Sequence, residues 1–376
     1  MNRLSIQAAL CLGAATLLAL FATACGSGGG DAPAGAETMS FKITDAGCVP
    51  HDAKAKAGPI EFQVQSESSK VTELEVLDGE TILGEKENLT EGLEGSFALT
   101  LEEGEYTVRC NGADDEDGIL TVTGELDTAT SPAVEEAVAE YRSYLEESTD
   151  ELVAATKPFV AAVIAGEIAK AKALYPAARI PYERIEPVAE SFGDLDPRID
   201  ARENDVPASE FGGFHRIEKA LWEEDSAKGM APVAEQLQAD VEELAQRVKS
   251  VKLQAVQIAN GANELLGEVS ASKITGEEER YSHIDLVDFK ANVEGSEKAF
   301  EDVEPLLSES DPQLAKEIEA DFEAVYESLE PYEQGDGFVA YTELTKADTR
   351  KLAQGIDALA EKLSQVPAVT VRQGTS

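Results

Sequence analysis

Histidine is scarce in this 376-residue chain, and one of the three histidines has a spacing typical of metal ligands. His215 precedes Glu218 by three positions, so on a helix the two side chains lie on one face. A neutral imidazole and a carboxylate can together hold one cation. The alternative is a buried histidine that pairs with a neighbouring acid for structural reasons. Other residues must decide between these two interpretations.

Two further groups of residues offer the same chemistry. Glu183 and Glu186 are three positions apart, and two carboxylates on one side of a helical turn cost free energy unless a cation or a proton lies between them. Asp200 follows in an acidic stretch, and His283 comes directly after Ser282, which we expect to cap a helix. Together these side chains suit ferric iron and are able to hold zinc or manganese. A solvated acidic face is the alternative.

The charge balance narrows the class of partner. Asp and Glu number 74 against 31 Lys and Arg, which gives a formal charge of −43. Such a chain is repelled by nucleic acid and by anionic membrane surfaces, and it attracts cations. Because 43% of the residues are hydrophobic, a chain of this length can form two domains with proper cores.

The first residues predict export from the cytoplasm. Residues 1–24 have a positive start, an apolar run and small residues before Cys25, as in a lipoprotein signal peptide. Cleavage there would leave Cys25 as a lipidated N-terminus, with residues 25–38 as a flexible tether. A plain secretory signal cut after Ala24 is the alternative. We expect an extracytoplasmic protein, periplasmic or at the cell surface, that is anchored to the membrane by its lipid.

Residues 39–124 predict a small β-sandwich. Apolar and polar residues alternate, as at Ile60, Phe62 and Val64, and turn signals separate about seven short strands. Cys48 and Cys110 form an even pair in an oxidising compartment, which favours a disulfide. Reduced cysteines that bind a soft cation such as Cu(I) are the alternative.

Residues 132–376 predict a helical bundle, after a linker at 125–131. Ser131 is expected to cap the first helix, with Pro132 at its first position. Apolar residues then recur every three or four positions, and proline-marked breaks divide the segment into six to eight helices. The expected breaks lie at Pro158, Pro176, Pro197, Pro207, Pro312 and Pro331. In a bundle, side chains from distant sequence positions converge between facing helices.

Three helical segments, residues 175–200, 213–222 and 279–300, resemble signature blocks of the EfeO family of extracytoplasmic iron-uptake proteins. Residues 46–50, 73–77 and 104–110 are similar to that family's N-terminal cupredoxin-like domain. The resemblance covers the whole mature chain. It implies a cupredoxin-like β-sandwich followed by an imelysin-like helical bundle.

The resemblance also implies a function and a set of ligands. It implies a protein that binds iron, ferric or ferrous, outside the membrane, passes it to a membrane permease and works with a haem-containing peroxidase. Copper and zinc are alternative metals. The positions that match proposed metal ligands are His215, Glu218, Glu183, Glu186, Asp200 and His283 in the helical domain, and Cys48, Cys110 and Glu73 at a second site in the β-domain. The β-domain has one histidine besides its two cysteines, which is too few for blue copper.

Two other function classes compete with iron capture. The imelysin-like family was classed with peptidases, but a zinc-peptidase helix presents two histidines four residues apart, and no second histidine follows Glu218. We therefore expect no enzyme. A general surface lipoprotein that binds divalent cations is also compatible with the charge. A polysaccharide-binding lipoprotein would need an aromatic platform, and the chain has one tryptophan.

Overall fold

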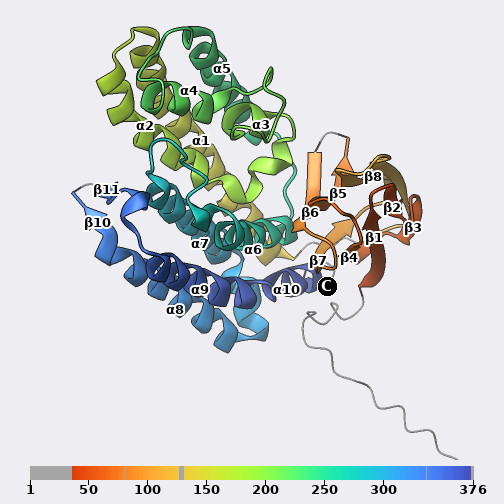
Figure 1. The fold of residues 1–376 in the computed structure, drawn as a ribbon. Coiled ribbons are helices and arrows are strands. Elements are labelled where there is room, and N and C mark those ends of the chain that lie inside the picture. Colours follow the sequence, from red (N-terminus) through yellow and green to blue (C-terminus); the bar gives the residue numbers. More distant parts are fainter. Residues whose placement is uncertain (1–35, 80, 127–130, 336, 374–376) are drawn as a thin grey trace, which may run out of the picture.

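The computed structural model describes residues 36–79, 81–126, 131–335 and 337–373. The predicted signal peptide, the lipidation site Cys25 and the tether up to residue 35 lie outside the described residues. A β-sandwich lies beside a larger helical bundle (Figure 1). In the described part of the chain, no helix is both long enough and apolar enough to cross a membrane.

The sandwich consists of two sheets. One sheet has the strand order β2-β1-β4-β7 and the other β3-β9-β8-β5-β6; only the β1–β4 and β3–β9 pairs are parallel. The strands are β1 (Glu37–Thr44), β2 (Gly47–Val49), β3 (Ala53–Lys56), β4 (Gly58–Ser66), β5 (Thr72–Asp78), β6 (Thr81–Leu89), β7 (Glu94–Leu101), β8 (Gly104–Asn111) and β9 (Asp117–Thr123). The predicted sandwich is confirmed, with nine strands here rather than about seven, because β2 and β3 are too short to show an alternating pattern.

The core of the sandwich follows the predicted alternation. Ile60, Phe62 and Val64 on β4 are buried, and the Phe62 ring stacks between those of Phe41 and Phe97 at centroid distances of 6.3 and 5.1 Å. A disulfide joins Cys48 on β2 to Cys110 on β8, so it links the two sheets across the core. The disulfide that the sequence favoured is present, and its sulfurs are not free thiolates that could bind a metal.

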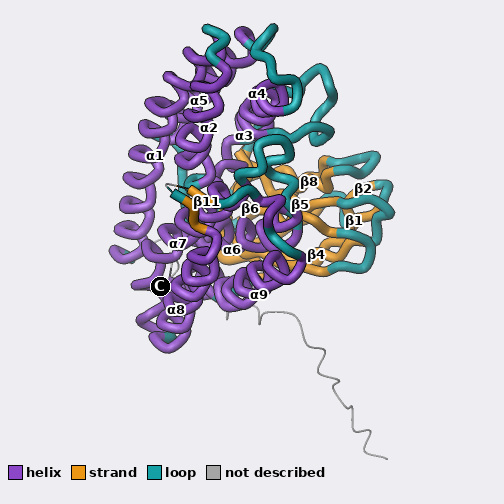
Figure 2. Tube along the Cα trace, turned by 60° about the vertical axis from the view of Figure 1, so that its left-hand side comes forward, coloured by secondary structure: helices purple, strands orange, loops and turns teal. Residues whose placement is uncertain are grey.

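The second domain is a bundle of helices (Figure 2). Its elements, with 3-10 helices marked η, are α1 (Pro132–Ile164), α2 (Ile168–Glu183), η1 (Glu186–Phe192), α3 (Leu195–Asp200), α4 (Gly213–Trp222), α5 (Ala231–Val248), α6 (Ala255–Ala271), η2 (Lys273–Thr275), α7 (Asp285–Ser310), α8 (Pro312–Leu329), η3 (Glu330–Tyr332), β10 (Glu333–Gln334), β11 (Gly337–Phe338), η4 (Tyr341–Glu343), α9 (Lys346–Leu363) and α10 (Val366–Gln373). The small β10–β11 hairpin is an exception to the predicted all-α segment, and the described residues form ten α-helices rather than six to eight.

Three of the predicted helix breaks are wrong, and one of them, Pro197, lies in the first turn of α3, which begins at Leu195. Pro158 lies inside α1 and Pro176 inside α2, although an interior proline removes a backbone hydrogen bond. Phe159 and Tyr175 beside these prolines are fully buried, and their rings lie 5.5 Å apart. Tertiary packing of these rings offsets the lost hydrogen bonds and keeps both helices continuous. The predicted cap is confirmed, since the Ser131 hydroxyl accepts a hydrogen bond from the N–H of Val134.

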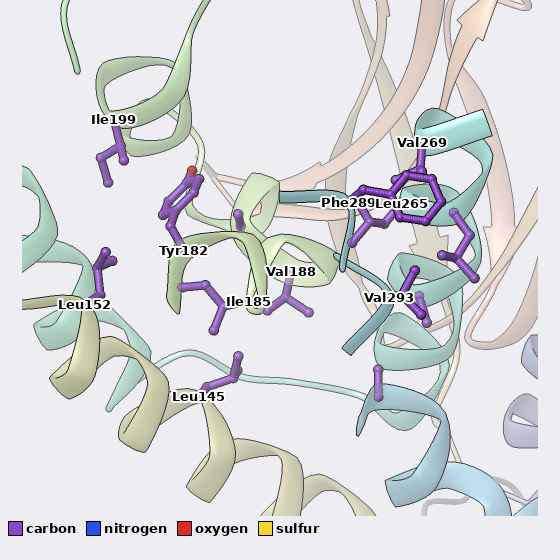
Figure 3. Close-up of a cluster of buried hydrophobic side chains, with 14 of the residues drawn as sticks. Leu145, Leu152, Tyr182, Ile185, Val188, Ile199, Leu265, Val269, Phe289 and Val293 are labelled. Atoms are coloured by element: carbon purple, nitrogen blue, oxygen red, sulfur yellow. The ribbon is translucent and has the colours of Figure 1, made fainter. Parts of the chain in front are cut away.

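The apolar core of the bundle runs between α1, the end of α2, η1, α6 and α7. Figure 3 shows Leu145 and Leu152 of α1 pointing toward Ile185 and Val188, with Phe289 and Val293 on the other side. Because this core fixes the end of α2 and the start of α7, it also fixes the polar residues that extend beyond it.

The two domains contact each other directly. Strands β6 and β7 lie against α6, η1 and α10 (Figure 1). The Lys86 ammonium pairs with Glu264 at 2.5 Å, and the side chains of Gln254 and Asn260 donate to backbone carbonyls of β7 at 2.9 and 2.8 Å. Strand β6 of the sandwich therefore lies beside η1 and α6 of the bundle.

Candidate metal centre

The predicted histidine–glutamate pair lies on α4, in the interior of the bundle. His215 Nδ1 and Glu218 Oε2 are 3.3 Å apart, as the three-residue spacing predicts, and both side chains are almost fully buried. Gly213 begins the helix at φ +64°, and a Cβ there would lie 2.1 Å from the carbonyl oxygen of Ile199. Only glycine allows α4 to start this close to the end of α3.

The second ring nitrogen of His215 faces two further acids. Nε2 lies 3.5 Å from Asp200 Oδ1 and 3.3 Å from Glu278 Oε1, and it is a buried atom with no hydrogen-bond partner of accepted geometry among the described residues. Burial and Arg179 lower the pKa of His215, but the contacts with Glu218 and Glu278 outweigh them, so this pKa lies above its ordinary value. A metal ion bound at Nε2 would replace a proton there.

Glu218 is held from the opposite side by backbone groups. Its Oε1 accepts hydrogen bonds from the N–H groups of Tyr281 and Ser282 at 2.8 and 2.7 Å. Burial raises the pKa of Glu218, but His215 and the Ser282 N–H outweigh burial and hold it below its usual range. The predicted helix cap at Ser282 is wrong: α7 begins at Asp285, and the Ser282 hydroxyl donates to Glu279.

A buried arginine, absent from the sequence-based site, lies at the centre of the cluster. Arg179 on α2 is fully buried and forms ion pairs with five acids. Its partners are Glu183, Asp200, Glu278, Glu279 and Asp288, the last three at 3.4, 3.2 and 3.2 Å. The i,i+4 spacing of Arg179 and Glu183 was a signal for this pairing.

A second buried cation, Lys273, holds the outer acids. It pairs with Glu186, and its Nζ lies 3.7 Å from Glu183 Oε2 and 3.6 Å from Glu278 Oε2. Glu183 ends α2 and Glu186 begins η1, so they do not share one helical turn as predicted. They do meet, because the Asn292 amide donates to both carboxylates.

The buried acids of the cluster outnumber its buried bases. Burial raises the pKa of Asp288 to about 7 against the opposing charge of Arg179, and it raises the pKa of Asp285 to about 6. Burial, with Glu218 and Asp288 nearby, also raises the pKa of Glu279 well above its usual range. Carboxyl groups in this state hold protons that a metal cation can replace.

Three groups of side chains in the described ranges could each offer a metal ion three ligand atoms within 4.8 Å of one another. The groups are Asp200–His215–Glu278, His215–Glu218–Glu279 and Glu183–Glu278–Asp288. Of the predicted ligands, His215, Glu218, Glu183 and Asp200 belong to these groups. Sequence reasoning missed Glu278 and Glu279 as ligands, because their run of three glutamates resembles a solvated loop.

Glu186 adjoins the cluster through Lys273 and Asn292 but belongs to none of these groups. The other predicted ligands lie elsewhere. His283 lines a separate pocket with Tyr341 and Lys346. In the β-domain, Glu73 accepts a hydrogen bond from Asn111 across the β5–β8 pair. None of the three groups includes His283, Glu73 or the bridged cysteines.

A cavity of about 240 Å³ leads from the surface to the cluster. Asp200 and Glu278 line it, and so do the outer acids Glu186 and Glu268. Glu87 on β6 also lines the cavity, so the sandwich contributes to its wall. Carboxylates from both domains therefore line the cavity, together with Arg202 and Lys273.

Comparisons with known proteins agree with this two-domain layout. A model of the imelysin family matches residues 137–366, and a model of the cupredoxin-like domain matches residues 12–122. The protein named "Iron uptake system component EfeO" from Escherichia coli K12 is 41% identical over 363 residues, which are 94% of this chain and 96% of that protein. The chain belongs to the EfeO family. EfeO proteins of Shigella flexneri and Shigella sonnei match it to the same extent.

The EfeO family assignment confirms the resemblance drawn from the sequence blocks, with a cupredoxin-like domain before an imelysin domain. Among solved structures, a purple cupredoxin from Nitrosopumilus maritimus covers 22% of this chain and 98% of its own length at 17% identity. Its TM-score of 0.20 is too low to support any argument.

Proposed function

We propose that this chain is an extracytoplasmic iron-binding component of an iron uptake system, which captures iron in the buried cluster and passes it to a membrane permease. The observation that carries the proposal is the buried Nε2 of His215, which has no hydrogen-bond partner of accepted geometry in the described structure and points at Asp200 and Glu278. Carboxylates with one imidazole form a hard ligand set that suits iron. Relatives with 41% identity are named as iron uptake components.

Within this proposal, Asp200, His215 and Glu278 are the primary ligands of the iron. Glu218 contacts the other ring nitrogen of His215 and is itself fixed by two backbone N–H groups. A carboxylate behind a ligating histidine sets the orientation of the ring and raises its basicity. Glu183 and Glu186 then act as outer acids that attract the cation, and Glu186 lines the entrance.

For the cellular location of the protein and for its partner proteins, we propose what the sequence predicts. Cleavage before Cys25 would give a lipid anchor, with a membrane iron permease and a haem-containing peroxidase as partners. A Cys25→Ser variant should then leave the membrane fraction and appear in the soluble extracytoplasmic fraction.

We infer a binding protein rather than a peptidase, because α4 carries one histidine and the zinc-peptidase helix needs two.

Titration calorimetry of the mature protein tests iron capture directly. Ferric nitrilotriacetate, Fe(II), Zn(II) and Cu(II) are titrated into the wild type and into a His215→Ala, Glu218→Ala variant. The matched control is His51→Ala, Asp52→Ala, because this exposed histidine–acid pair in the β-domain has a similar contact of 3.1 Å. We expect the iron affinity to fall at least 100-fold in the first variant and to stay unchanged in the control.

Single variants test the assignment of ligands. Asp200→Asn and Glu278→Gln keep the size of each side chain and remove one charged ligand. Each should lower the iron affinity by at least about 10- to 100-fold, the range produced even by loss of a residue that only positions a metal ligand. An unchanged iron affinity in the His215→Ala, Glu218→Ala variant would eliminate the proposed site.

A further inference from the structure

A second pocket, of about 590 Å³, opens on another side of the bundle and has the opposite electrostatic character. His283, Lys346 and Arg350 line it, and none of its lining residues is an acid. Three other pockets in the described residues are each lined by at least three acidic residues. In a chain with 74 acidic residues, a pocket lined by two cationic side chains and no acid favours an anion over a cation.

The charged groups of this pocket are not neutralised by the protein. Within the described ranges, Lys346 and Arg350 have no ion-pair partner, unlike Arg179 and Lys273 in the acidic cluster. The nearby carboxylate of Asp348 accepts hydrogen bonds from the backbone N–H and the hydroxyl of Thr345, at 2.8 and 2.7 Å. Both cationic side chains are therefore available to a ligand.

Hydrogen bonds hold the inner wall of the pocket together. Tyr341 is buried, its hydroxyl donates to the carbonyl of Ile274, and its N–H donates to the carbonyl of His283 at 2.9 Å. Gly276 has φ +81°, and a Cβ there would lie 2.7 Å from the Tyr341 ring. The backbone of His283 is also fixed from the other side, since its N–H donates to the carbonyl of Glu279 at 2.9 Å.

The residues directly before His283 and Ile274 in this wall contact the acidic cluster. The N–H groups of Tyr281 and Ser282, directly before His283, hold the carboxylate of Glu218. Lys273, directly before the lining residue Ile274, holds Glu183 and Glu186. A ligand that immobilises His283 also immobilises the turn that positions Glu218.

We propose that this pocket binds a small anion with several carboxylate or phosphate oxygens, held by His283, Lys346 and Arg350, and that its binding further restricts opening of the turn at residues 279–283. Guanidinium and ammonium groups bind such oxygens through charge-assisted hydrogen bonds. The binding of the anion does not depend on the proposed iron capture, because the two sites share no side chain.

Citrate and inorganic phosphate are the probes, titrated by calorimetry into the metal-free mature protein. The Lys346→Ala, Arg350→Ala variant should bind the preferred anion at least 10-fold more weakly than the wild type. The matched control is Lys316→Ala, Lys351→Ala, which removes the same charge from exposed positions on α8 and α9 outside the pocket. Tighter binding of citrate identifies a polycarboxylate ligand, and tighter binding of phosphate identifies a phosphate ligand.

Hydrogen exchange measured by mass spectrometry tests the link to the cluster. The saturating anion should slow exchange of the amides of Tyr281 and Ser282 several-fold in the wild type but not in Lys346→Ala, Arg350→Ala. Two results would overturn the proposal: no saturable binding of either anion by the wild type, or an equal loss of binding in the control variant. A normal iron titration alongside such a failure would leave iron capture standing.

Discussion

Arg179→Gln is the substitution that most directly probes the buried charges of the cluster. The guanidinium is fully buried and forms ion pairs with five acids, of which Glu183, Glu279 and Asp288 are themselves almost fully buried. Glutamine is polar and shorter than arginine, and it carries no charge. The substitution therefore leaves several carboxylates in the interior without their central counter-ion.

The expected loss of stability is large. Removal of one partner from a buried ion pair costs about 3–5 kcal/mol, because the remaining charge stays desolvated. For a domain of this size, about 2–4 °C of melting temperature corresponds to each kcal/mol. We therefore expect the metal-free Arg179→Gln protein to melt about 6–20 °C below the wild type at pH 7.

The loss should depend on pH with a defined sign. The pKa of Asp288 in the folded protein, about 7, already exceeds its unfolded value of 3.8 although Arg179 lowers it. The contribution of the protonated Asp288 carboxyl group to the free energy of unfolding is therefore fully present below pH 3.8, and it is lost as the pH rises through 7. Removal of Arg179 raises this folded pKa further, so the difference between variant and wild type should be larger at pH 7 than at pH 4.

Thermal unfolding followed by circular dichroism, with and without ferric nitrilotriacetate, measures both effects. Arg184→Gln is the matched control, because this arginine lies five residues further on, is about one-third exposed and pairs with Glu294 at 2.8 Å. Exposed pairs of this kind contribute about 0–1 kcal/mol. Iron should raise the melting temperature of Arg179→Gln more than that of the wild type. An Arg179→Gln protein as stable as Arg184→Gln would refute the reasoning.

Three further outcomes follow from individual residues. Burial, with Glu73 nearby, raises the pKa of Glu75 from 4.5 to about 8, so the wild type loses stability as the pH rises through this range. Thermal melts should show that Glu75→Gln loses less stability than the wild type over the same pH range, by on the order of 2–4 kcal/mol. Replacement of Cys48 and Cys110 by serine should cost about 4 kcal/mol in urea unfolding, given their separation of 62 residues. Gly213→Ala should weaken calorimetric iron binding about 10-fold or more by displacing α4, whereas Gly267→Ala, where a Cβ meets nothing within 4 Å, should not.

Local sequence patterns were enough to predict the fold class and one pair of residues in the buried cluster, His215 and Glu218. Alternation in β4 and the three-residue spacing of His215 and Glu218 are properties of single elements, and the structure preserves both. The roles of Glu278 and Arg179 depend instead on where α2 packs against the turn before α7. In so acidic a chain, a glutamate run gives no local sign that it folds inward.

His283 shows why proximity in sequence was misleading. Glu279 and Asp285 on either side of it belong to the buried cluster, where the Asp285 carboxylate accepts the N–H of Glu279 at 3.1 Å. His283 itself has φ +59°, a left-handed conformation, and its side chain lines the other pocket. A tight turn thus separates side chains that an unbroken helix would have placed at calculable positions, and no spacing rule predicts that outcome.

The ion pairs of Arg179 bear on where in the cluster the proposed metal ion would bind. Arg179 already forms ion pairs with all three members of the Glu183–Glu278–Asp288 group, so a metal ion there would have to displace the guanidinium. In the Asp200–His215–Glu278 group, Nε2 of His215 has no hydrogen-bond partner of accepted geometry among the described residues, and Asp200 and Glu278 line the entrance cavity. Arg179 also pairs with Asp200 and Glu278, so a metal ion in either group would compete with the guanidinium, and the histidine group differs in offering Nε2, which has no hydrogen-bond partner of accepted geometry in the described structure.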